Sequence, residues 1–430
     1  MTPFVNDTIP NPKSSVSVQP ENAACRFCGS SLKTVFVDLG MSPLSNAYIR
    51  IDELNNAEAF YPLKTYVCDC CFLVQLLQYE SPESIFSDYA YFSSYSDTWL
   101  EHSRQYADMI CDRLQLDHQT FVVELASNDG YLLQYFIKKN IPVLGVEPAE
   151  NVALAAQEKQ IPTIARFFGR NLAQELIRQG KAADLIIGNN VLAHVPDIND
   201  FVAGMKILLK PGGVITMEFP HLLELITHNQ FDTIYHEHFS YLSLLTVEKI
   251  FAHHGLKVFD VEQLSTHGGS LRIFAAHFDA HSDSVTDRIV SLRAMEFTHG
   301  LTDMQKYLTF AERVKETKRA LLKCLIGIKE NGKKIAAYGA AAKGNTLLNY
   351  CGIRTDIIDY VADRSPHKVG KFLPGTHIPV TPPEHIQEDR PDYLLILPWN
   401  LKEEIVEQTK YIRQWGGRFI IPIPDIQIVD

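Results

Sequence analysis

The sequence has no excess of basic residues. It carries 40 Lys and Arg against 51 Asp and Glu, which gives a formal net charge of −11, and its pI is about 5.8. A protein that binds nucleic acid or an anionic membrane surface needs a basic face, so we expect neither partner. The charge still leaves room for a local basic pocket that holds a phosphorylated small molecule.

Long apolar runs are also missing. No stretch is long enough to span a bilayer, and residues 1–20 are polar and lack the apolar core of a signal peptide. We therefore expect residues 1–20 to form a disordered tail and the protein to be cytoplasmic. With 430 residues, 46% of them hydrophobic, the chain is long enough for roughly three domains of ordinary size.

Cysteine is sparse, with eight residues, and four of them are paired in a pattern typical of metal sites. Cys25 and Cys28 form one C-x-x-C pair, and Cys68 and Cys71 form a second. In a reducing compartment metal binding is favoured over disulfides, and two such turns bring four thiolates to one tetrahedral ion. The sequence therefore predicts a structural zinc site, with Cys70 as a surplus thiol between the ligands.

The G-x-G-x-x-G fingerprint of dinucleotide-binding proteins is absent from the first α/β segment. A buried strand at 121–125 ends in a small-residue turn and opens a helix, as in the first unit of a doubly wound sheet. Glu124 and Asp129 place acids in this strand and turn, which suits an amino-bearing ligand better than a phosphate. The next strand, at 142–147, ends in Glu147, which is well placed to accept both hydroxyls of a ribose.

Strands and helices then continue to alternate. The pattern predicts a short strand within 161–168, a buried strand at 183–190, a helix at 201–209 and, after a turn at 210–213, a strand at 214–219. This spacing is typical of a parallel α/β sheet.

This α/β segment resembles the S-adenosylmethionine-dependent methyltransferases. The resemblance rests on the acids at the ends of the strands, the aromatic pair after the third strand and the Pro-Gly-Gly turn before the fifth. The resemblance implies that Asp129 and Gly130 lie by the methionine part of the cofactor, Glu147 by the ribose, and Phe167 or Phe168 near the adenine. It extends the expected cofactor contacts to Glu124, Ala126, Asn128, Pro148, Asn189, Asn190 and His194. Family members usually have glycine where this chain has Ala126. The alternative is another doubly wound binding protein.

Residues 231–241 crowd two histidines and two tyrosines around a glutamate, and no amphipathic period explains the pattern. His and Glu side by side are the usual general-base chemistry, so we expect a proton-handling site at Glu237 and His238, with Tyr235 nearby. A polar loop of hydrogen-bonded histidines is the alternative.

Three further stretches have the composition of ligand-binding turns. Residues 81–100 alternate Tyr and Ser, which fits either a surface turn or a pocket for a polyhydroxylated ligand. Residues 266–272 contain a pair of glycines, which permits the backbone to approach a ligand closely. Arg272 in the same stretch either binds a phosphate or is a solvated strand residue. The small-residue turn 339–344 follows a strand, and its backbone amides together with Lys343 could hold a phosphate. The same residues fit a tight strand–helix turn with a solvated lysine equally well.

Taken together, the chain resembles the nucleotide-sugar C-methyltransferases that make branched deoxysugars. The resemblance rests on the order of its motifs: the paired C-x-x-C module, the methyltransferase core, Tyr235–Ser243, His267–Arg272, Tyr338–Lys343, Pro374–Pro379 and Pro398–Asn400. It implies an α/β fold of three parts. These are a zinc-binding domain at 21–80, a central Rossmann-like methyltransferase domain at 81–300, and a C-terminal Rossmann-like sugar-nucleotide domain at 301–430, entered through an amphipathic connecting helix at 301–330.

The resemblance also implies a reaction. The substrate is a nucleotide-linked keto-deoxysugar: its ketone acidifies the neighbouring C3 hydrogen, a base removes it, and the enolate takes the methyl group of S-adenosylmethionine. His238 is the expected base, with Glu237 orienting it and Tyr235 near the oxyanion; the division among the three stays open. The residues expected at the substrate are Tyr91, Ser93, His267, Arg272 and Lys343.

Three alternatives belong to other classes. An oxygen or nitrogen nucleophile needs less help from a base than a carbon acid does. An O- or N-methyltransferase would therefore leave the His-Glu-Tyr cluster unexplained. A non-catalytic zinc-containing scaffold does not explain the intact acids and histidines. An oxidoreductase requires nicotinamide binding, and neither α/β segment carries a complete dinucleotide fingerprint.

Overall fold

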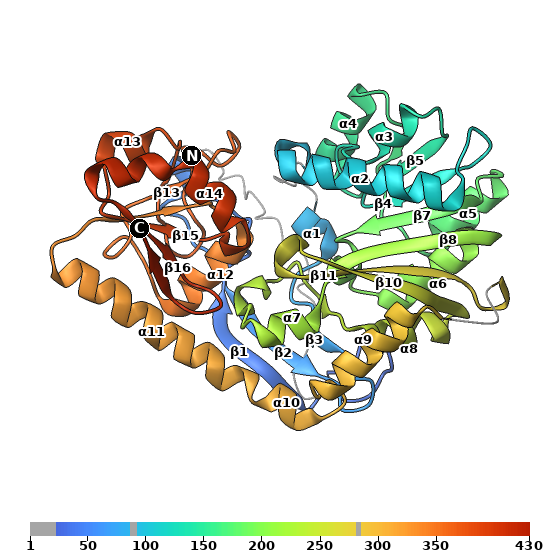
Figure 1. Cartoon of the computed structure of the whole chain (residues 1–430), viewed down its shortest axis with the longest axis horizontal. Coiled ribbons are helices and arrows are strands. Elements are labelled where there is room, and N and C mark those ends of the chain that lie inside the picture. Colours follow the sequence, from blue (N-terminus) through green and yellow to red (C-terminus); the bar gives the residue numbers. More distant parts are fainter. Residues whose placement is uncertain (1–22, 87–92, 281–284) are drawn as a thin grey trace, which may run out of the picture.

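Three β-sheets organise the computed structural model, which describes residues 23–86, 93–280 and 285–430 (Figure 1). The expected tail, residues 1–20, lies outside the described residues. The first sheet is antiparallel and has the order β1–β2–β3–β9. Its strands are β1 (Thr34–Ser42), β2 (Tyr61–Val67), β3 (Val74–Leu76) and β9 (Ser240–Tyr241). β9 therefore joins this N-terminal sheet from the middle of the chain, directly after the His-Glu-His segment.

The central sheet has the order β10–β11–β8–β7–β4–β5–β6. Its strands are β4 (Val122–Leu125), β5 (Val143–Val146), β6 (Thr163–Ile164), β7 (Ala183–Asn189), β8 (Leu209–Pro220), β10 (Leu256–Leu264) and β11 (Ser270–His277). The first five run parallel, while β10 and β11 are antiparallel additions at one edge. The chain reverses its winding direction between β4 and β7, and a crevice at the carboxyl ends of the strands is expected there.

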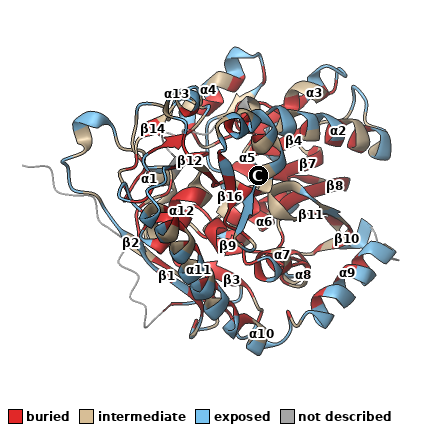
Figure 2. Cartoon of the chain, turned by 60° about the vertical axis from the view of Figure 1, so that its left-hand side comes forward, coloured by how far each residue is buried: buried red, intermediate tan, exposed pale blue. Residues whose placement is uncertain are grey.

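Helices cover this sheet because its parallel strands are apolar on both faces. The helices in this part of the chain are α1 (Pro82–Phe86), α2 (Asp97–Leu114), α3 (Leu133–Ile137), α4 (Glu150–Glu158), α5 (Arg170–Arg178), α6 (Ile198–Leu208), α7 (Leu222–Thr227), α8 (Leu244–His253) and α9 (Asp287–Thr298). Of these, α7 packs in the core of the N-terminal sheet instead. Figure 2 shows the central strands as buried, whereas α9 presents an exposed outer face.

The C-terminal sheet has the order β14–β13–β12–β15–β16–β17, and β17 alone among these six strands is antiparallel. Its strands are β12 (Ile335–Tyr338), β13 (Val361–Ala362), β14 (Val380–Thr381), β15 (Tyr393–Ile396), β16 (Arg418–Ile421) and β17 (Gln427–Val429). The helices of this part are α12 (Ala342–Cys351), α13 (His385–Asp389) and α14 (Lys402–Gln408). The predicted α/β fold class, with a central Rossmann-like sheet, is confirmed.

The connecting helix is divided in two, as α10 (Met304–Leu308) and α11 (Phe310–Glu330), with Thr309 between them. The buried residues of α11 follow helical spacing, as expected for an amphipathic helix. Phe310 stacks on Phe36 of β1, with ring centroids 4.6 Å apart, so the connector packs on the N-terminal sheet. No helix among the described residues has the length and apolarity needed to cross a membrane.

The expected turn at 210–213 is part of a strand instead. β8 starts at Leu209, and its register with β7 shifts between the pairs Ala183–Leu209 and Leu185–Val214. The extra residues form a bulge in which Gly213 lies against the chain of β7, where a Cβ atom would come within 3.0 Å of the Ala183 carbonyl oxygen. Pro-Gly-Gly therefore marks a close backbone approach within the strand, and not its beginning.

Candidate active site

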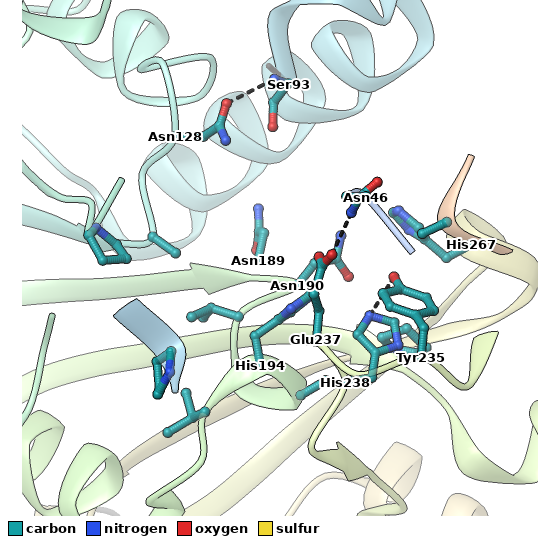
Figure 3. A pocket seen from close by; sticks show the side chains of 18 of the residues that line it. Asn46, Ser93, Asn128, Asn189, Asn190, His194, Tyr235, Glu237, His238 and His267 are labelled. Carbon is teal, nitrogen blue, oxygen red and sulfur yellow. Dashed lines mark hydrogen bonds between the residues drawn. The ribbon is translucent and has the colours of Figure 1, made fainter. Parts of the chain in front are cut away.

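A cavity of about 560 Å³ opens at the carboxyl ends of the central strands. All three parts of the chain contribute to its wall, and Figure 3 shows the polar side chains that face it. The predicted site residues in its lining are Ser93, Ala126, Asn128, Glu147, Pro148, Phe167, Asn189, Asn190, His194, Tyr235, Glu237, His238, His267 and Lys343. Tyr91 lies outside the described residues.

One side of the cavity is built from the turns after β4, β5 and β7. The carboxylate of Glu147 accepts the backbone N–H groups of Asn128 (3.0 Å) and Ala149 (2.8 Å), and burial raises its pKa to about 7. Both polar atoms of the Asn189 side chain are buried without a hydrogen-bond partner, although the residue faces the cavity. Unsatisfied amide groups in a cavity wall are costly and indicate the place of a polar ligand.

Ala126 lines the cavity in a left-handed backbone conformation, with φ of +55°. Such a conformation is tolerated by glycine and costs an L-residue about 1–2 kcal/mol. A left-handed conformation explains why the resemblance implies a glycine at this position, and in this chain an alanine adopts that conformation.

Ala126→Val is expected to lower the free energy of unfolding by about 1–2 kcal/mol, because a β-branched residue is more strained than alanine at positive φ. Ala126→Gly is the matched control and should stay within about 1 kcal/mol of the parent, since relief of strain and loss of unfolded-state restriction oppose each other. Urea titrations of the three proteins measure the effect. A valine variant as stable as the parent would contradict the left-handed conformation.

Three of the predicted cofactor residues do not line the cavity and lie within the protein next to its wall. Asp129 is buried, and its Oδ2 accepts Lys159 Nζ at 2.9 Å and the Ser94 hydroxyl. Gly130 has φ of +77°, and a Cβ atom there would collide with Ile161. Glu124 is fully buried in β4, where burial raises its pKa well above the usual value.

The opposite side carries the His-Glu-Tyr segment. His238 Nδ1 lies 2.8 Å from the carbonyl oxygen of Thr233, so Nδ1 must donate and Nε2 is left as the acceptor nitrogen. The Tyr235 hydroxyl, 2.8 Å from Nε2, therefore donates to His238 (Figure 3). Burial, with the charges of neighbouring His and Lys side chains, lowers the pKa of His238 well below the usual range. A neutral imidazole thus faces a phenol at the cavity wall, an arrangement that can accept a proton.

Glu237 is oriented by a residue from the N-terminal part of the chain. Asn46 Nδ2 donates to Glu237 Oε1 at 2.5 Å, and both residues line the cavity. The sequence prediction missed Asn46, because a single Asn in a loop gives no signal of a contact 191 positions away.

The C-terminal domain closes the cavity with the start of α12. Ala341, Ala342 and Lys343 line it, together with Lys368, which donates to the carbonyl oxygen of Ala340 at 2.8 Å. Lys343 Nζ lies 3.2 Å from Asn400 Oδ1. Two ammonium groups and a helix N-terminus can bind an anionic group. The sequence prediction included Lys343 but missed Lys368.

Arg272 has a different environment from the one predicted. It does not line the cavity, and its guanidinium pairs with Glu218 and Glu262, each at 3.0 Å. Glu218 also accepts His102 at 2.9 Å and Thr266 at 2.9 Å. Burial raises the pKa of Glu218, but these donors outweigh it, so the net pKa is lowered and the carboxylate is charged. The positive charge of Arg272 is therefore already balanced inside the protein.

The four predicted zinc ligands converge. Their sulfur atoms all lie within 4.8 Å of one another, and Cys25–Cys71 and Cys28–Cys68 are 3.6 Å and 3.5 Å apart. Zn–S bonds of about 2.3 Å in a tetrahedron place sulfurs about 3.8 Å apart, so the set fits the ion. Cys70 is exposed and is not part of the group. Next to the ligands, the half-buried Arg26 donates to the carbonyl oxygen of Pro196 at 2.6 Å, and Pro196 lines the cavity.

Family models match three successive parts of the chain. A putative zinc binding domain covers residues 25–86, a methyltransferase domain 99–261, and a C-methyltransferase C-terminal domain 265–424. With the convergent thiols, the first match identifies the four cysteines as a structural zinc site.

Individual proteins resemble this chain to very different extents. C-methyltransferase NovU of Streptomyces niveus is 36% identical over 405 residues, which are 94% of this chain and 96% of that protein. An ubiquinone biosynthesis O-methyltransferase of Rhizobium etli is 24% identical over 95 residues, 22% of this chain and 38% of that one. Among solved structures, glycopeptide N-methyltransferase MtfA covers 41% of this chain and 96% of its own (TM-score 0.33, 14% identity). Magnesium protoporphyrin IX methyltransferase of Synechocystis PCC 6803 covers 45% and 88% (TM-score 0.32, 17% identity).

Proposed function

The chain belongs to the C-methyltransferase family, and from this we propose that it transfers a methyl group from S-adenosylmethionine to a ring carbon of a nucleoside-diphosphate 4-keto-deoxysugar, at C3. The observation that carries the proposal is the Tyr235–His238 pair in a cavity that also holds the start of α12. A carbon acid needs a base, whereas an oxygen or nitrogen nucleophile needs less help.

The turns after β4, β5 and β7 would hold the cofactor. Glu147 would accept from the ribose, and Asn189 would use its two unsatisfied polar atoms on the same ligand. Phe167 and Phe168 line this part of the cavity and offer apolar surface to the adenine. When bound, S-adenosylmethionine supplies the electrophilic methyl group.

The Tyr235–His238 pair would handle the proton. The ketone of the substrate acidifies the hydrogen on C3, and the leaving proton is taken up by the pair at His238 Nε2. The C–H electrons would form an enolate, whose carbon would take the methyl group as the S–CH3 bond breaks and the thioether S-adenosylhomocysteine is left behind. Glu237, held by Asn46, would orient the sugar hydroxyls or the pair itself. The diphosphate would meet Lys343, Lys368 and the amides that begin α12.

A labelled-methyl assay tests this proposal. The protein is incubated with S-adenosylmethionine and a panel of dTDP-, GDP- and CDP-4-keto-deoxysugars, and the products are examined by NMR. The expected product has a new methyl carbon bonded to ring carbon C3. A methyl group on oxygen or nitrogen would contradict C-methylation of these sugars, and absence of transfer to every member of the panel would contradict the substrate class.

A further inference from the structure

Trp399 lies between two opposite charges at the C-terminal wall of the cavity. Its indole Nε1 donates to Asp232 Oδ2 at 2.7 Å, while Lys343 Nζ lies over the face of the same ring, 4.9 Å from its centroid. Asp232 is fully buried, and Trp399 is nearly so. The proposed reaction gives neither residue a role.

This order of groups is electrostatically favourable. Donation of the N–H to an anion raises the electron density of the indole ring, and the ring face then attracts a cation more strongly. Burial lowers the pKa of Lys343, and the carboxylate of Asp232 opposes that shift. Burial also raises the pKa of Asp232 to about 6, which leaves the carboxylate largely charged at neutral pH.

Two polar contacts also fix the position of the Lys343 ammonium group. Its ammonium lies 3.2 Å from Asn400 Oδ1 and 3.4 Å from the carbonyl oxygen of His267. The titratable groups that face it are Asp232, beside the catalytic segment, the imidazoles of His238 and His267, and Lys368 across the cavity. Both imidazoles have lowered pKa values and are neutral at neutral pH. Asp232 is the charged group that raises the pKa of Lys343, and it acts against burial, which lowers that pKa.

We propose that Asp232 and Trp399 are positioning residues for Lys343, which they keep charged and directed into the cavity for the substrate diphosphate. The inference rests on the proposed function, in which a nucleoside diphosphate occupies this wall. Because Asp232 immediately precedes Thr233, whose carbonyl oxygen accepts from His238, the same contact joins the diphosphate side of the cavity to the catalytic segment.

The test measures the affinity of the full-length zinc-loaded protein for thymidine, guanosine and cytidine diphosphates by titration calorimetry between pH 6.5 and 9. Asp232→Asn keeps an acceptor for the indole but removes the charge. Without the carboxylate the pKa of Lys343 falls further, so its charge is lost at lower pH. The expected result is a dissociation constant about tenfold higher at pH 8.5 and a smaller change at pH 6.5, since a pKa shift of one unit corresponds to a tenfold effect.

Two further variants separate charge from structure. Trp399→Phe removes the N–H donor and should reproduce the alkaline weakening. Lys343→Ala should weaken binding at every pH, and adding Asp232→Asn to it should change nothing more, because the two act through one ammonium group. Asp260→Asn, which removes a buried carboxylate paired with Arg113 and Arg288, is the control and should leave the pH profile unchanged. Binding of S-adenosylhomocysteine reports that each variant is folded.

The outcomes distinguish a failure of this positioning role from a failure of the proposed function. Parent-like pH profiles for both Asp232→Asn and Trp399→Phe, with Lys343→Ala weakened, would overturn the positioning role alone. A parent protein that binds none of the three nucleoside diphosphates would overturn both this role and the proposed nucleotide-sugar substrate.

Discussion

His238→Ala is expected to lower kcat for methyl transfer by about a thousandfold while S-adenosylhomocysteine binds with nearly unchanged affinity. A positioned general base contributes typically 10²–10⁴-fold to a rate, and His238 Nε2 is the proton acceptor of the pair in the cavity. Single-turnover measurements with the labelled methyl donor separate this chemical step from binding. The tautomer supports the choice of atom, because Nδ1 is already engaged with the carbonyl oxygen of Thr233.

The pH dependence gives a second measurement on the same residue. Because burial lowers the pKa of His238, its imidazole stays neutral and able to accept a proton below pH 6.5, where a free imidazole is mostly protonated. The acid limb of kcat that belongs to this group should therefore lie below pH 6.5.

Tyr235→Phe should lower kcat by about a hundredfold, as expected for a lost proton-transfer partner.

His228→Ala is the control for these variants, since this histidine is exposed and lies outside the cavity lining. It should have parent-like turnover. Parent-like turnover of His238→Ala as well would exclude His238 as the base and transfer that role to Glu237 or Tyr235.

Cys71→Ser is expected to release the zinc and to lower Tm by about 10 °C or more, with a parallel loss of S-adenosylhomocysteine affinity. Structural zinc contributes directly to folding free energy, and replacing one of four thiolates opens the site. The effect should reach the cavity because Arg26, which lies between two ligands, donates to the carbonyl oxygen of Pro196. Asn199, near the start of α6, donates to the carbonyl oxygens of Arg26 and Phe27 and makes a second connection.

Cys70→Ser is the matched control, since Cys70 belongs to the same knuckle but is exposed and outside the ligand set. Metal analysis should find one zinc per chain in the parent and in this control. Calorimetric scans and titrations with S-adenosylhomocysteine complete the comparison. A Cys71→Ser protein that retains stoichiometric zinc would contradict the four-thiolate site.

Local patterns in the sequence predicted the parts of the fold that depend on local physics. The buried strand expected at 121–125 is present as β4 (Val122–Leu125), because its apolar run is a local feature. The C-x-x-C pairs likewise identified the zinc ligands through their own spacing. The turn at 210–213 was predicted wrongly, since a Pro-Gly-Gly bulge and a Pro-Gly-Gly turn look alike until the neighbouring strand is known.

Contacts between distant parts of the chain could not be predicted in the same way. Arg272 was expected at a phosphate, but its charge is balanced by Glu218, 54 positions away, and by Glu262 on the neighbouring strand β10. Asp129 was expected at the cofactor, but Lys159 pairs with it. Asn46 and Lys368 were missed because a single polar residue in a loop has no periodicity or spacing to identify it. Charge pairing and cavity lining depend on the tertiary fold, whereas motifs record the local backbone.

The position of β9 in the N-terminal sheet has a consequence for the order in which the protein assembles on the ribosome. β3 ends at Leu76, and its neighbour β9 begins at Ser240, more than 160 residues later. At about 5–20 residues per second, synthesis leaves the edge of β3 unpaired for on the order of ten seconds. The zinc knuckles can form early in this interval, but the sheet is completed after most of the central domain has emerged. The segment 235–238, which lies just before β9, is therefore fixed late in assembly, when the first domain acquires its last strand.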